Sequence, residues 1–425
     1  MRFRFPSRWE GRDHGPNPLT EAVTARRAAG LPLLDLTISN PTTVGLAFPE
    51  DWPGLLTGQD GGSLGGKAVG AGRAAVEAIR GYDPDPRGLA TARRALEAYY
   101  RARGALAPGA DDFFLTAGTS EAYSHLFKLL CEPGDAILAP RPSYPLLDTL
   151  ADLAGLHIDS YPLIARPARS NSPEAVPRPA ATRWDIDRDA LVAALTPRTR
   201  IIVVVTPNNP TGSVWSQEDA AWLVTLAQAR GLALVVDEVF ADYRHDGKTT
   251  PLVHSDGPLV FTLNGLSKLV GLPQLKLAWI HVAGNAPDKA VACETLEWMC
   301  DAALSVSTAS QIACAGLLRR RHEFQTPIHE RIAVNRATLH TAAVATPRLE
   351  VLWPEGGWCV PVRCTGIVDD EAFAIQLMDE AGVLVQPGYF FDFEDEEIIV
   401  LSLLTPPEVF RTGVEHIANA LRKII

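Results

Sequence analysis

The sequence lacks several features that define other classes of protein. Its 425 residues contain no apolar run of the roughly 18 residues that a membrane-spanning helix needs, and residues 1–9 lack the apolar core of a signal peptide. The net charge of −11 is spread along the chain without a basic stripe, which argues against a nucleic-acid surface. The six cysteines form no Cys-x-x-Cys pair, which favours reduced thiols. We therefore expect a soluble cytoplasmic protein that acts on small molecules and has no membrane, nucleic-acid or metal partner.

Residues 82–282 alternate helical patterns with short apolar runs that end in turn residues. The runs 136–139, 201–205 and 232–236 are continuously apolar, as expected for strands that are buried on both faces. This alternation predicts an α/β fold with a mostly parallel central sheet. We assign it to a large domain at residues 70–325.

The rest of the chain predicts a smaller α+β domain, built from residues 1–69 and 326–425. An N-terminal helix at 20–30, followed by an extended segment at 33–38, is expected to pack on it. The segments 58–72 and 165–183, rich in glycine and proline respectively, are expected to be loops. The other elements expected here are a long helix at 323–341 and strands at 349–353, 358–363 and 398–404.

Polar segments follow the predicted strands of the large domain. The sequence TPNNPTG at 206–212 follows one strand, DEVF at 237–240 ends the next, and NGLSK occupies 264–268. The first of these could be a simple turn if it stood alone. Ligands of open α/β sheets bind beyond the carboxyl ends of the strands, so three polar segments in such places predict a binding site.

With these segments the chain resembles the class I/II aminotransferases, which are fold-type-I enzymes dependent on pyridoxal phosphate (PLP). The resemblance extends in order over most of the chain. It implies a large PLP-binding domain with a mostly parallel sheet and a smaller α+β domain. The further matching segments are Tyr82, Gly88-Leu89 and Arg93, then TAGTSEA at 116–122, PGD at 133–135, PSYP at 142–145 and PG at 387–388.

The resemblance implies that Lys268 forms a Schiff base with PLP, which requires an amine of lowered pKa in a partly desolvated site. Asp237 would pair with the ring nitrogen, whose protonation makes PLP an electron sink. Glu238, on the opposite face of the strand, is the alternative. Asn209 would donate a hydrogen bond to the phenolate oxygen of PLP, unless it only forms a turn before Pro210.

Gly118, Thr119 and Ser120 begin a predicted helix, whose free N–H groups favour a phosphate, although they could be an ordinary N-cap. Ser267 and Lys276 resemble further phosphate ligands.

Two tyrosines complete the expected cofactor site. Tyr82 resembles a tyrosine that relatives donate across a dimer interface, which implies a homodimer with shared active sites. Tyr144 stands where relatives place a ring on the pyridine, with core packing as its alternative.

The substrate side of the site departs from the family. Val400 stands where relatives carry an arginine that clamps the α-carboxylate of the substrate, and Arg363 on the neighbouring predicted strand is the candidate replacement. Asn40 and Trp358 resemble pocket-lining residues, although a turn and a core position explain them equally well. Phe240 replaces a common tyrosine, which removes a hydroxyl near the cofactor. Other departures are Gly265 in place of a serine and Lys276 in place of an arginine.

Together these features predict a PLP-dependent aminotransferase that moves an amino group between an amino acid or amine and a keto acid. A PLP-dependent lyase that eliminates a β-substituent would use the same lysine and aspartate. A PLP-binding protein without turnover is the third possibility, but it leaves the chemistry of Asn209, Asp237 and Lys268 without a use.

Overall fold

The computed structural model describes residues 15–59, 67–104, 108–167, 182–248 and 255–424. Its main element is an eight-stranded sheet. Strands β3, β4, β6, β7 and β8 run parallel, whereas β9 and β5 run antiparallel to their neighbours, so the predicted mostly parallel sheet is confirmed. In spatial order the strands are β2 (Phe113–Thr116), β9 (Ala278–Ala283), β8 (Val260–Gly265), β7 (Ala233–Asp237), β6 (Thr199–Val205), β3 (Ala136–Arg141), β4 (His157–Pro167) and β5 (Thr182–Ile186).

Helices cover both faces of this sheet because its strands are apolar on both faces. Along β6, Ile201 and Val203 belong to one buried cluster and Ile202 and Val204 to another, as the alternation of side chains in a strand requires. The first cluster includes residues of α4 (Thr119–Leu130), α5 (Leu146–Ala154) and α9 (Ala286–Ala303). The second includes residues of α6 (Arg188–Ala194) and α7 (Gln217–Arg230). A third, around β2 and β9, includes α3 (Ala90–Ala102) and α10 (Thr308–Arg319).

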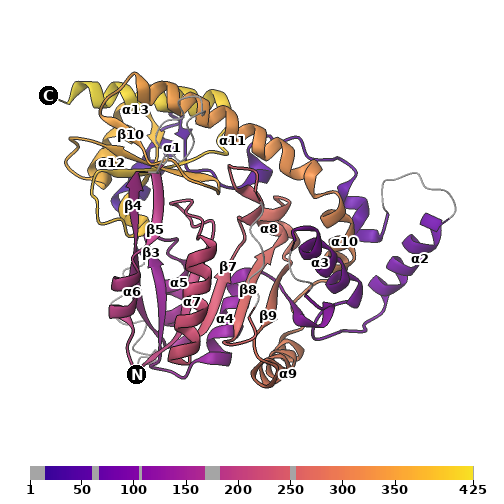
Figure 1. Cartoon of the computed structure of the whole chain (residues 1–425). Coiled ribbons are helices and arrows are strands. Elements are labelled where there is room, and N and C mark those ends of the chain that lie inside the picture. The colour runs from indigo at the N-terminus through magenta and orange to yellow at the C-terminus, as the bar shows by residue number, and fades with distance from the viewer. Residues whose placement is uncertain (1–14, 60–66, 105–107, 168–181, 249–254, 425) are drawn as a thin grey trace, which may run out of the picture.

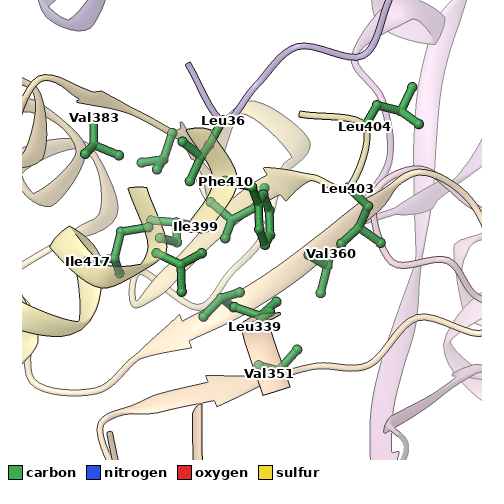
Figure 2. Close-up of a cluster of buried hydrophobic side chains, with 14 of the residues drawn as sticks. Leu36, Leu339, Val351, Val360, Val383, Ile399, Leu403, Leu404, Phe410 and Ile417 are labelled. Carbon is green, nitrogen blue, oxygen red and sulfur yellow. The ribbon is translucent and has the colours of Figure 1, made fainter. Parts of the chain in front are cut away.

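The C-terminal part forms a second, four-stranded antiparallel sheet in the order β10 (Leu349–Val351), β11 (Cys359–Cys364), β14 (Ile398–Ser402) and β13 (Gln386–Pro387). Helices α11 (Arg321–Val344), α12 (Asp370–Ala381) and α13 (Pro407–Lys423) pack around it. Figure 1 shows α11 and α13 along its outer side. Figure 2 shows its apolar core, where Leu339, Val360, Ile399 and Phe410 meet from different elements.

The N-terminal segment packs on this second unit, as predicted. Leu19 and Val23 of α1 (Pro18–Ala28) lie in the same core, and Arg26 donates a hydrogen bond to the Met378 carbonyl at 2.9 Å. Strand β1 (Leu34–Asp35) pairs in parallel with β12 (Val383–Leu384). The domain limits at 70–325 stay a prediction. Val400 of the smaller sheet shares a cluster with strands of the large one, so the two cores are continuous.

The predictions of loops at 58–72 and 165–183 are each wrong in part. Lys67 begins helix α2 (Lys67–Arg80), which lies at the edge of the molecule in Figure 1, because the alanines of this segment favour a helix despite its glycines. Strands β4 and β5 extend into the second loop, up to Pro167 and from Thr182. The rest of these two loops, residues 60–66 and 168–181, lies outside the described residues.

Within the described part of the chain, no helix combines the length and the apolar character needed to cross a membrane. The six cysteines are unpaired, which agrees with the expected reduced thiols.

Candidate active site

The polar segments singled out in the sequence meet at one edge of the large sheet. Strands β6, β7 and β8 are parallel neighbours, so Val205, Asp237 and Gly265 end at the same edge. Strand β9 is antiparallel and begins there, with Ala278 opposite both Gly265 and Thr116. The loops that carry Asn209, Asp237, Lys268, Lys276 and Gly118 therefore gather at the carboxyl edge of the sheet, where α/β proteins bind ligands.

Lys268 lies in the short helix α8 (Leu266–Leu269), which directly follows β8. Its Nζ lies 5.1 Å from the centre of the Trp358 ring and 5.7 Å from that of Phe240. Burial among these groups lowers the pKa of Lys268, and the nearby Cys359 and Asp237 oppose this shift. A lowered pKa increases the fraction of neutral amine, which is the nucleophilic form.

The backbone around Lys268 is held by side chains that the sequence analysis did not identify. The Tyr243 hydroxyl donates a hydrogen bond to the Lys268 carbonyl at 2.9 Å. Gln325, on α11, donates to the Leu269 carbonyl at 3.1 Å. Neither residue belongs to a segment that resembles the family motifs, so only the folded chain reveals them.

The two adjacent carboxylates at the end of β7, Asp237 and Glu238, have separate surroundings. Asp237 accepts hydrogen bonds from the Tyr123 hydroxyl at 3.0 Å and from the Val239 amide at 3.1 Å. Glu238 instead accepts two hydrogen bonds from Arg103, at 3.0 and 3.2 Å, in a buried ion pair. Arg103 neutralises Glu238, whereas no cation is hydrogen-bonded to Asp237 among the described residues. The structure thus leaves Asp237 as the carboxylate available to a cationic ligand.

Burial raises the pKa of Asp237 to about 6, although its two hydrogen bonds act in the opposite direction. Because the folded protein then holds this proton more tightly than the unfolded chain does, stability is lost as the pH rises from about 4 through 6. We expect Asp237→Asn to stabilise the cofactor-free protein by about 3 kcal/mol at pH 8 and to have little effect below pH 4. Urea unfolding of both proteins at the two pH values tests this. A stability difference that does not depend on pH would contradict it.

Gly118, Thr119 and Ser120 form the first turn of α4, as predicted, with Gly118 as the N-cap residue. A Cβ atom on Gly118 would lie 3.2 Å from Lys276 Nζ, so glycine leaves room for that ammonium group above the turn. Free N–H groups at the start of α4 and the charge of Lys276 together suit a phosphate. Ser267 lies in the first turn of α8.

Asn209 follows β6 and has no hydrogen bond to its buried Oδ1 atom among the described residues. The buried Trp358 Nε1 has none either. Buried polar atoms are rarely left unpaired, so these atoms suit a bound polar molecule. Neighbouring Asn208, which the sequence analysis did not identify, donates to the Pro142 carbonyl at 2.8 Å and so fixes the loop that carries Tyr144.

The structure gives less support to the other predicted site residues, which are Tyr82, Tyr144 and Asn40. Tyr82 is 84% exposed and Tyr144 is 51% exposed. Asn40 caps the short helix at Pro41–Thr43 by accepting a hydrogen bond from the Thr42 amide. The Ser402 hydroxyl donates to the Ile38 carbonyl at 2.6 Å, which places the segment before Asn40 beside the end of β14. The roles of Asn40, Tyr82 and Tyr144 stay predictions.

The contacts of Arg363 count against the role expected for it. It lies on β11 opposite Ile398, and its guanidinium binds Asp395 at 2.8 Å and Glu350 at 2.6 Å. Two carboxylates therefore already neutralise its charge, and a substrate carboxylate would have to displace them. Val400 is fully buried in an apolar cluster with Val204 and Phe391, so the structure provides no cation at that position either.

The residues at this sheet edge match the chemical groups of PLP: a desolvated lysine, a buried carboxylate, the side-chain amide of Asn209 and a helix N-terminus beside Lys276. Fold and site together define a PLP-dependent enzyme of fold type I. The model of the aminotransferase class I and II family matches residues 73–417, and the chain belongs to this family. It is thus a PLP-dependent aminotransferase.

Named relatives are distant in sequence. The chain is 26% identical to the alanine aminotransferase of Mycobacterium tuberculosis, over 95% of this chain and 89% of that protein. It is 27% identical to a glutamate-pyruvate aminotransferase of Escherichia coli, over 73% and 75% of the two chains. Among solved structures, the alanine aminotransferase of Pyrococcus furiosus superposes with a TM-score of 0.82 at 19% identity, covering 99% of this chain and all of that one. At such identity the last comparison shows the fold alone.

Proposed function

We propose that Lys268 is the residue that bonds covalently to PLP and that it also moves the proton during amino-group transfer. PLP, when bound, supplies an aldehyde for this bond and an electron sink for the substrate. When it is not bonded to the cofactor, Lys268 Nζ would be a free amine in a desolvated position. It would then take the proton from the substrate α-carbon and release it on the cofactor side of the imine nitrogen, which is the proton shift that amino-group transfer requires. The observation that supports this most directly is the position of Nζ beside the rings of Trp358 and Phe240, with Asp237 close enough to influence its charge.

The other cofactor roles follow from the same geometry. Asp237 would bind the protonated ring nitrogen, because it is a buried carboxylate that is hydrogen-bonded to no cation in the described part of the chain. Asn209 would donate to the phenolate oxygen. The α4 turn at Gly118, Thr119 and Ser120 would bind the phosphate, together with Ser267 and Lys276.

The substrate class depends on what replaces the arginine that Val400 lacks. Val400 is sealed in an apolar cluster and Arg363 is already paired, which supports a substrate wall without a free cation on β11 and β14. We therefore expect amines without a carboxylate to be accepted at least as well as alanine or glutamate, the donors suggested by the names of its relatives.

An absorbance titration of the PLP-loaded protein with these donors tests both the reaction and its substrates. Transamination converts the cofactor to its amine form in a single half-reaction, and a keto acid reverses the change. Conversion by α-amino acids alone would contradict the proposed substrate wall and would require a carboxylate-binding cation elsewhere. Release of ammonia and a keto acid without conversion would contradict transamination and indicate a lyase.

We also propose that the active form is a cytoplasmic homodimer with shared active sites. The high exposure of Tyr82 supports this, because its ring is available to a second chain. The unpaired cysteines support a reducing compartment.

A further inference from the structure

Tyr123 is a buried polar residue that the roles described above do not use. It lies on α4, one turn after Thr119, and its side chain is 2% exposed. Its ring packs against Phe127 at a centroid distance of 5.8 Å, which fixes its orientation. Its hydroxyl donates a hydrogen bond to Asp237 Oδ2 at 3.0 Å. This hydroxyl therefore connects α4 with the end of β7.

Helix α4 thus carries two groups that face different parts of the same site. Its first turn holds the residues that we assign to the phosphate, and Tyr123 follows Thr119 by about 6 Å along the helix axis. A helix is rigid over this length, so the phosphate turn and the Tyr123 hydroxyl keep a constant separation. The hydrogen bond from Tyr123 therefore fixes the Asp237 carboxylate relative to the phosphate turn.

We propose that Tyr123 is a positioning residue that holds the Asp237 carboxylate at the ring nitrogen of PLP, while the same helix holds the phosphate. This inference rests on the proposed role of Asp237. The other hydrogen bond to Asp237 comes from the Val239 amide and reaches Oδ1, so it does not fix Oδ2. Without the hydroxyl, Oδ2 would lose its donor in a buried site, and the carboxylate would hold its charge and its orientation less well.

The experiment compares two ligands that differ only at the ring nitrogen. These are PLP and its carbocyclic analogue, in which a C–H group replaces that nitrogen. Dissociation constants are measured with the full-length cofactor-free protein in four forms: wild type, Tyr123→Phe, Tyr161→Phe and Asp237→Ala. The analogue has no ring nitrogen, so its affinity reports on every other proposed contact, namely those to the phosphate, the phenolate oxygen and the aldehyde, together with packing.

Tyr161→Phe is a matched control. Tyr161 is as deeply buried as Tyr123, and its hydroxyl donates to the Val203 carbonyl at 2.9 Å instead of to a carboxylate. Both substitutions remove one hydroxyl and keep the ring, so they leave the packing in place.

We expect Tyr123→Phe to bind PLP about tenfold more weakly than wild type, with unchanged affinity for the analogue. Tyr161→Phe should keep the wild-type ratio of the two affinities. An equal loss for both ligands in Tyr123→Phe would assign Tyr123 to packing alone, and no loss for either would give it no part in the site. Both results overturn the proposal. If Asp237→Ala leaves the affinity ratio unchanged, the carboxylate does not pair with the ring nitrogen and the proposed cofactor site itself fails.

Discussion

Lys268→Ala is expected to remove the covalent link to PLP and to lower kcat/KM at least about 1,000-fold. The estimate follows because the substitution removes a proton-transferring group, worth about 100- to 10,000-fold by itself, together with the nucleophile. The loss of the visible absorbance of the lysine-bound cofactor and the residual turnover measure the two roles separately. A small primary amine added to the variant should restore part of the proton transfer, because it can occupy the space left by the side chain.

Lys276→Ala provides the contrast within the same site. Its ammonium lies at the phosphate turn, so this variant should bind PLP more weakly but retain the visible band once the cofactor is saturating. A Lys268→Ala protein with an unchanged spectrum, or a Lys276→Ala protein that loses the band at saturation, would show that the two lysines have been assigned incorrectly.

Arg103→Met is expected to lower the unfolding free energy by about 3–5 kcal/mol, because it leaves the buried Glu238 carboxylate without its cation. Arg103 also donates a hydrogen bond to Tyr99, so its removal disturbs a connected polar network. Arg101→Met, in the last turn of α3 just before Arg103, is the control. Arg101 pairs with Glu97 at the surface, and such pairs contribute less than about 1 kcal/mol.

Two further results would identify the unpaired charge of Glu238 as the cause of the lost stability. The double variant Arg103→Met/Glu238→Gln should regain much of the lost stability, since it leaves no unpaired carboxylate. Burial already raises the pKa of Glu238, and loss of Arg103 would raise it further. The destabilisation should therefore shrink as the pH falls and Glu238 takes up a proton. Equal urea sensitivity of Arg103→Met and Arg101→Met would contradict the inferred strength of the buried pair.

The sequence predicted those parts of the fold and site that have a local signal. Continuous apolar runs marked the strands around β6 and β7, and the polar residues that follow them marked Asn209, Asp237 and Lys268. Tyr123, Tyr243 and Gln325 could not be found in this way. Each acts on a residue more than 20 positions away, and nothing in the local sequence reports that contact.

Arg363 shows a different limit of sequence reasoning. The sequence placed it on a strand next to that of Val400, and in the structure β11 does pair with β14, with Pro361 opposite Val400. Its partners Glu350 and Asp395 come from neighbouring parts of the chain, and their positions depend on how the strands pair. The error in α2 arose from local propensity, because glycine content predicted a loop where alanines sustain a helix.

Helix α11 has a mechanical consequence for the lysine. Near its start, Gln325 binds the carbonyl of Leu269, the residue after Lys268. Asn335, about 15 Å further along, donates to the Leu403 and Thr405 carbonyls beyond β14. One helix, with Pro327 between the two contacts, therefore joins the backbone beside Lys268 to the rim of the smaller sheet. A displacement of that rim would therefore be transmitted along α11 to the backbone beside Lys268.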